Sequence, residues 1–177
     1  VTILAIVDGK QWNQVAVLVE EGGVLIMAGI QTLDDVDQYV PIARAIAGKI
    51  SLTPLEVAIM DGDIELSQTI ASEDGMLTVK YPEGWVAEAY RDSVHFASSR
   101  EAFDNYVEDF EEGMASGSVF ILDLDEWGLE TGASPEDAMA AIVVAADGFE
   151  ISAIDTFEVN GREAALVTIW DVEDGKQ

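Results

Sequence analysis

The carboxylates of the segment DLDEWGLETG, residues 123–132, have the spacing in this chain that most suggests chemistry. Asp123, Asp125 and Glu130 offer the hard oxygen ligands that Ca²⁺ prefers, and Gly128 stands at the sixth position of a calcium-binding loop. The segment lacks an oxygen ligand at the fifth position and a glutamate at the twelfth. We therefore expect either a Ca²⁺ site or a solvated acidic loop, and the sequence indicates no other cofactor.

His95 is the only histidine of the sequence. It alternates with Val94 and Phe96, which predicts a strand that holds the imidazole on the face opposite those apolar side chains. A Ser-His-Asp site needs a nucleophile held against this ring, and the sequence has no G-x-S-x-G motif and no glycine-rich nucleotide motif. We predict that His95 is a structural or surface residue and that the protein is not an enzyme.

Two tryptophans, Trp85 and Trp127, stand beside predicted turns. An exposed indole at such a place could contact a ligand such as a glycan. The alternative is that both rings pack over the turns as part of the core. Trp12 and Trp170 lie in predicted strands, where core packing is favoured.

Acidic side chains dominate the composition, with 35 Asp and Glu against 8 Lys and Arg and a formal net charge of −27. A surface of this sign repels phosphate backbones and anionic lipids, so we predict no nucleic-acid partner. Hydrophobic residues still make up 49% of the 177 residues, which is enough for a packed core. No apolar run approaches the ~20 residues that cross a bilayer, so we predict no membrane insertion.

Alternating apolar residues and turn motifs predict an α+β fold with antiparallel strands. A helix is expected after Thr32, and Pro41 inside its pattern predicts either a kink or a helix that begins near Val40. Ser134-Pro135 followed by two acidic residues marks the start of another helix. The remaining predicted elements are a helix between residues 99 and 113 and strands at 1–7, 12–19, 24–30, 76–81, 86–90, 94–97, 119–122, 150–159 and 163–170.

Residues 53–75 differ in character from the rest of the chain, because Pro, Gly and acidic turn residues interrupt two short extended pieces. Leu55, Val57 and Ile59 alternate along the first of these pieces, which predicts a segment that buries one face. It is either a strand that lies on a neighbouring domain, and so an inter-repeat contact, or a plain linker or edge strand.

The segments Val1–Gln11 (VTILAIVDGKQ) and Val167–Gln177 (VTIWDVEDGKQ) are identical at seven of eleven positions. Because Val167 follows Val1 by 166 residues, we interpret the chain as one period of a tandem repeat with a short overlap. The chain would then begin and end in mid-domain. On this interpretation residues 1–52 are the C-terminal half of one repeat, 53–75 are the inter-repeat linker, and 76–177 are the N-terminal part of the next repeat.

When the second half of the chain is placed first, three segments resemble one known family: LTVKYPEGW at 77–85, VNGREAALVTI at 159–169 and ARAIAGKISL at 43–52. In that order they resemble the opening strand with its Tyr-Pro-x-Gly-Trp turn, the mid-domain hairpin and the terminal helix of the PsbP-like family. The resemblance implies an antiparallel β-sheet flanked by helices, the PsbP-like α/β/α sandwich. The three motifs are structural and imply no catalytic residue.

The repeat predicts a structural unit of an extracellular tandem-repeat string or filament at the cell surface. Its partners would be neighbouring copies of the same repeat. The alternative is a cell-envelope domain that binds a glycan or another small molecule near Trp85 and Trp127. In an open array the segments 1–52 and 76–177 would belong to different domains, and they would meet in one domain only if the array closes on itself.

Overall fold

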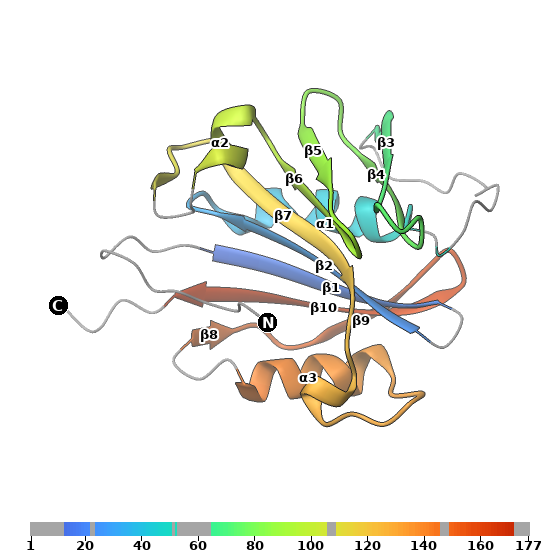
Figure 1. Ribbon diagram of the computed structural model, residues 1–177. Helices are drawn as coiled ribbons and strands as arrows, with labels where there is room; N and C mark the ends of the chain where they lie inside the picture. The colour runs from blue at the N-terminus through green and yellow to red at the C-terminus, as the bar shows by residue number, and fades with distance from the viewer. Residues whose placement is uncertain are drawn as a thin grey trace, which may run out of the picture.

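The computed structural model describes residues 13–21, 24–50, 52, 65–105, 109–145 and 149–171 (Figure 1). All paired strands in these ranges are antiparallel, and helices are few. The sheet-rich α+β class that the sequence predicts is therefore confirmed. The predicted strand at residues 1–7 and the alternating residues Leu55, Val57 and Ile59 lie outside the described residues.

One large antiparallel sheet contains eight of the described strands: β1 (Asn13–Glu21), β2 (Val24–Thr32), β5 (Val86–Ala89), β6 (Ser93–Ala97), β7 (Ala115–Ile121), β8 (Phe149–Ile151), β9 (Asp155–Val159) and β10 (Arg162–Asp171). Their order is β5-β6-β7-β2-β1-β10-β8, and β9 pairs with the first half of β10. The strands β1 and β2 contain the uninterrupted apolar runs Val15–Val19 and Val24–Ile30. Such runs are typical of strands that are buried on both faces of a sheet.

The helices and turns of the described chain are η1 (Val36–Gln38), α1 (Val40–Ala47), α2 (Arg100–Asp104), η3 (Asp125–Trp127) and α3 (Pro135–Ala145). Figure 1 shows α1 and α3 on opposite sides of the large sheet. α1 contacts β1 and β2, and α3 contacts β10 and β1. None of the described helices has the length and apolar character that would let it span a membrane.

The chain enters α1 through a short capped turn. Asp35 accepts a hydrogen bond from the N–H of Asp37 at the start of η1, whereas Thr32, after which the sequence predicts a helix, is the last residue of β2. Pro41 lies in the first turn of α1, where its missing N–H removes no helical hydrogen bond. The helix therefore begins at Val40, as one of the two sequence alternatives predicts.

Serine side chains define the starts of the other two helices. Ser99 accepts a hydrogen bond of 3.0 Å from the N–H of Ala102 at the start of α2, and Ser134 accepts one of 3.1 Å from the N–H of Asp137 at the start of α3. The α2 helix already ends at Asp104, so it is shorter than the pattern between residues 99 and 113 predicts.

An apolar core lies on each face of the large sheet, because alternate residues of each strand point to opposite faces. On the first face, the strands pack against α1 and against a separate hairpin of β3 (Gln68–Ala71) and β4 (Thr78–Tyr81). On the second face, they pack against α3. The first core includes Val15, Val17, Val19, Ala43, Ile46, Leu77 and Val79, and the second includes Ala16, Leu18, Leu25, Ala138, Met139 and Ile142.

Both halves of the chain contribute strands to the large sheet. β1 pairs with β10 so that Asn13 lies opposite Trp170, and β2 pairs with β7 so that Ile26 lies opposite Ile121. Strands from 1–52 and from 76–177 therefore lie side by side in one sheet. In that sheet β1 and β2 occupy the centre. The division into two half-repeats with an inter-repeat linker at 53–75 stays a prediction.

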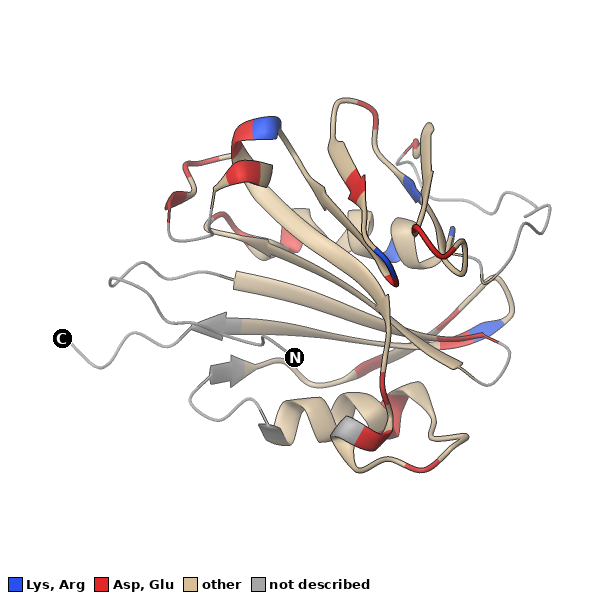
Figure 2. Ribbon diagram, in the orientation of Figure 1, with Lys and Arg blue, Asp and Glu red and all other residues tan. Residues whose placement is uncertain are grey.

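Charged residues are distributed unevenly over the fold (Figure 2). Asp and Glu lie mainly in loops and in short helical turns, whereas the central strands carry few charges. Lys and Arg are sparse throughout the described chain. The large negative charge is thus carried by the periphery of the molecule and leaves the two cores apolar.

Candidate functional site

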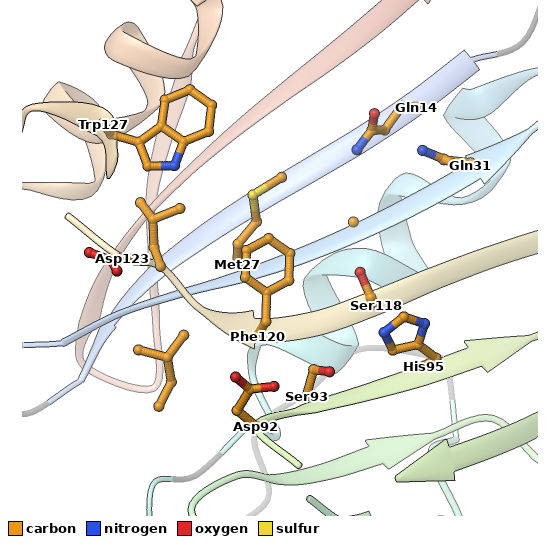
Figure 3. A pocket seen from close by; sticks show the side chains of 13 residues that line it. Gln14, Met27, Gln31, Asp92, Ser93, His95, Ser118, Phe120, Asp123 and Trp127 are labelled. Carbon is orange, nitrogen blue, oxygen red and sulfur yellow. The ribbon is translucent and has the colours of Figure 1, made fainter. Parts of the chain in front are cut away.

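The two faces of the large sheet are covered to different extents. On the first face, side chains such as Val17, Ile30 and Val119 are completely buried under α1 and the β3–β4 hairpin. On the second face, α3 covers only the part that carries residues such as Leu18. The remaining part of this face, over β1, β2, β7 and β6, borders a pocket of about 780 Å³ (Figure 3). We call it the sheet pocket.

The sheet pocket combines polar and apolar walls. Figure 3 shows Trp127 on one side, Gln14 and Gln31 on the other, and Met27 and Phe120 between them. No lysine or arginine is among the described residues that line it. Its lining consists of Gln14, Met27, Gly29, Gln31, Asp92, Ser93, His95, Ser118, Phe120, Ile121, Leu122, Asp123 and Trp127.

Small residues hollow out the floor of the pocket. Gly29 of β2 lies directly opposite Ser118 of β7 in the sheet register, so two small lining residues are neighbours. A Cβ atom at position 29 would lie only 3.1 Å from Nε2 of Gln14. The amide of Gln14 therefore extends over the glycine, into space that a side chain would otherwise fill.

Gln14 brings an unpaired polar atom to the wall of the pocket. Only 6% of this residue is exposed, and its Oε1 is buried without a hydrogen-bond partner. Leaving a buried acceptor unsatisfied costs about 1–3 kcal/mol, and buried polar groups are normally paired. Because Gln14 also lines the sheet pocket, a donor on a bound molecule could satisfy this amide.

Trp127, on the opposite side of the pocket, also holds an unpaired polar atom. Its ring packs against the second core, and its Nε1–H is buried and has no acceptor. An indole N–H is a donor only, and it usually finds a partner when buried. The pocket is thus bordered by one unpaired acceptor on Gln14 and one unpaired donor on Trp127.

His95 also lines the pocket, from β6. It is more exposed than its neighbours Val94 and Phe96, which are buried on the first face, and this confirms the predicted alternation. In the sheet register it lies opposite Ser118, and its ring centroid is 4.4 Å from that of Tyr90. Partial burial lowers the pKa of His95 below its usual 6.5, so the imidazole is neutral at pH 7 and can both donate and accept a hydrogen bond.

The two tryptophans that the sequence singles out do not form one site. Trp85 packs against the first core, with its ring centroid 5.8 Å from that of Phe96. Trp127 packs against the second core, on the other face of the sheet. A single small ligand therefore cannot contact both indoles, and Trp127 is the one that borders the pocket.

The acidic loop has a local structural role. The carboxylate of Asp123 accepts a hydrogen bond of 3.1 Å from the N–H of Asp125, at the start of the η3 turn. Among the residues whose side chains are described, no three His, Asp or Glu groups gather as a metal site requires. Ca²⁺ binding by Asp123, Asp125 and Glu130 stays a prediction.

Sequence reasoning missed Gln14, Gln31 and Ser118. A signal was available, because Gln14 and Gln31 are polar residues directly beside the apolar runs Val15–Val19 and Val24–Ile30. They lie directly opposite each other in the register of β1 and β2. Ser118 lies near them only because β2 pairs with β7. The paired residues Gly29 and Ser118 are almost ninety positions apart in the sequence, so no local sequence pattern indicates that they are neighbours.

Comparisons with protein families, curated proteins and solved structures find no match for this chain. Its function is therefore inferred from two features, the repeated segment of the sequence and the sheet pocket.

Proposed function

We propose that the protein is a structural repeat unit of an extracellular tandem string or filament, built from PsbP-like α/β/α sandwiches. The observation that carries this proposal is the pairing of β10 with β1, in which Trp170 lies opposite Asn13. The segment Val167–Gln177, which includes the end of β10, resembles the segment Val1–Gln11, which is separated from β1 by one residue.

In an array with a period of 166 residues, these two segments are the same stretch of chain. The residue equivalent to Asn13 in the next period then follows Trp170 by nine positions. A connection of this length joins antiparallel neighbours in a sheet without a crossover. The pairing that such a hairpin would produce is the pairing that β1 and β10 make here.

Two further features support the proposal. Helices on opposite faces of an antiparallel sheet have the layer order of the sandwich that the sequence resembles. The net charge of −27 would make neighbouring copies repel one another except where specific contacts hold them, which disfavours random association.

The complete coding sequence tests the repeat directly. We expect further copies of the chain at a spacing of about 166 residues, because the repeated segments imply that period. A coding sequence that contains one copy only would overturn the proposal.

The inter-repeat contact is tested with a protein of two successive periods. If Leu55, Val57 and Ile59 bury one face of an extended segment against a neighbour, the two-period protein melts at a higher temperature than the single period. Replacement of all three by Ser abolishes this gain, whereas the matched control, Glu56→Ser with Ala58→Ser on the alternate positions, keeps it. Equal melting temperatures for one and two periods would reject the contact.

The sheet pocket favours a second function, the binding of a small ligand by each unit. The observation that supports this second function is that two residues lining the sheet pocket hold unsatisfied polar atoms, Gln14 Oε1 and Trp127 Nε1. A ligand-observed NMR screen with a fragment library tests it. Saturable binding that is lost when Ser118→Phe fills the pocket supports this function, and binding that survives Ser118→Phe contradicts it.

A further inference from the structure

We infer that the sheet pocket binds an uncharged carbohydrate. This inference rests on the ligand-binding function proposed above and specifies the chemical class of the ligand. It is carried by the charge of the lining, by its hydrogen-bonding groups, by its aromatic surface and by the two unpaired polar atoms.

The charges around the pocket exclude anionic ligands. Asp92 and Asp123 are exposed lining residues, and no Lys or Arg stands among the described residues of the lining. The whole molecule carries a net charge of −27, which repels phosphates, carboxylates and sulfates as they approach. The ligand is therefore neutral, or else positively charged.

The polar lining residues match hydroxyl groups better than ammonium groups. Gln14 and Gln31 carry amides, Ser118 a hydroxyl and His95 a neutral imidazole, and each of these groups can both donate and accept hydrogen bonds. A sugar hydroxyl also donates and accepts. An ammonium group only donates, so it would leave the donors of this wall unused.

An apolar surface lies beside this polar wall. The half-buried ring of Phe120 lies between Ser118 and Trp127 in the pocket, and Met27 lies next to it (Figure 3). A carbohydrate ring has hydroxyls at its edge and C–H groups on its faces. It can therefore place its C–H face on Phe120 while its hydroxyls reach Gln31 and Ser118. Pockets with a mainly apolar lining and a few placed polar groups are typical of small-ligand sites.

The two unpaired polar atoms also favour a ligand that carries several hydroxyls. Gln14 Oε1 needs a donor and Trp127 Nε1 needs an acceptor, and the two residues stand on opposite sides of the pocket (Figure 3). Both atoms are buried in this conformation, so a ligand with several hydroxyls would satisfy them after small rotations of the two side chains. The volume of about 780 Å³ lies within the range of roughly 300–1,000 Å³ that small-ligand sites occupy.

The test begins with an array of neutral and acidic glycans, followed by calorimetry with the neutral glycans that bind. We expect saturable binding of neutral glycans and none of sialylated or sulfated ones. Gln31→Ala and Ser118→Phe each weaken the affinity at least tenfold. Gln68→Ala, which removes an exposed strand glutamine on the separate hairpin, leaves it unchanged. Because Gln31→Ala removes side-chain atoms without adding bulk, it tests the pocket even if Ser118→Phe does not fold.

The same proteins are screened with non-sugar fragments and with tetramethylammonium. If these probes bind in a way that Ser118→Phe abolishes while no neutral glycan binds, the carbohydrate class is overturned and the ligand-binding function stands. If no probe of any class binds, both are overturned. Neutral-glycan binding that neither Gln31→Ala nor Ser118→Phe weakens would also overturn the inference, because it would place the glycan elsewhere.

Discussion

The guanidinium of Arg162 lies 2.6 Å from the carboxylate of Glu21 and thereby joins the start of β10 to the end of β1. The same guanidinium donates hydrogen bonds of 3.0 Å to the backbone carbonyls of Ala47 and Ile50, at and just beyond the end of α1. A cation at a helix C-terminus also interacts favourably with the helix dipole. One side chain therefore fixes the position of α1 on the first face of the sheet.

We expect Arg162→Ala to lower the free energy of unfolding by about 2–4 kcal/mol, because it leaves a carboxylate and two carbonyls without their donor. Arg162→Lys recovers only part of this loss. An ammonium lacks the planar fork with which the guanidinium reaches both the Glu21 carboxylate and the carbonyls at the end of α1. Urea unfolding followed by circular dichroism measures both changes.

Arg100→Ala is the matched control for this prediction. Arg100 pairs with Glu88 at 2.7 Å, but more than half of its side chain is exposed. Water screens exposed ion pairs and they add little to stability, so this variant should unfold close to the wild-type midpoint. If Arg100→Ala and Arg162→Ala lose the same stability, the structural role assigned to Arg162 is wrong.

Gly117 is required by close packing between β7 and its neighbours. A Cβ atom at this position would overlap the backbone oxygen of Gly29 and would lie 2.9 Å from the ring of Phe96. We expect Gly117→Ala to lose more than about 3 kcal/mol or to fail to fold, because backbone cannot move aside as a side chain can. Ser118→Ala, at the next position of the same strand, should change stability by less than about 1 kcal/mol. A soluble Gly117→Ala protein with wild-type stability in thermal unfolding would contradict the packing described here.

The start of α3 depends on the hydroxyl of Ser134, which accepts a hydrogen bond from the N–H of Asp137. Ser134→Ala should cost about 1 kcal/mol, and Ser134→Asp should restore most of it because a carboxylate also accepts this bond. Urea unfolding of the two variants gives their free energies of unfolding. The difference between them separates the contribution of the cap from any general effect of substitution at this position. Equal losses for Ala and Asp would mean that the hydroxyl does not cap the helix.

Local features of the fold were predictable from the sequence, and the site largely was not. The start of α3 and the hairpin at Asn160-Gly161 depend on neighbouring residues, and positive φ angles at both turn positions match the motif. The faces of Trp85 and Trp127 depend instead on which side of the sheet the turn before β5 and the η3 turn lie. Two tryptophans that both stand beside predicted turns therefore lie on opposite faces of one sheet.

The lowered pKa of His95 predicts a specific loss of stability in mild acid. Burial disfavours the protonated ring in the folded state, so below pH 6.5 the unfolded chain binds a proton more readily than the folded chain. The stability contributed by the neutral ring is complete above pH 6.5 and declines as the pH falls toward the folded pKa. His95→Gln removes this dependence, so the stability difference between wild type and variant should shift in favour of the variant between pH 7.5 and pH 5.5. NMR titration of the imidazole should give a midpoint below 6.5. A midpoint at or above 6.5, or a stability difference that does not change with pH, would show that the ring is not desolvated in the pocket.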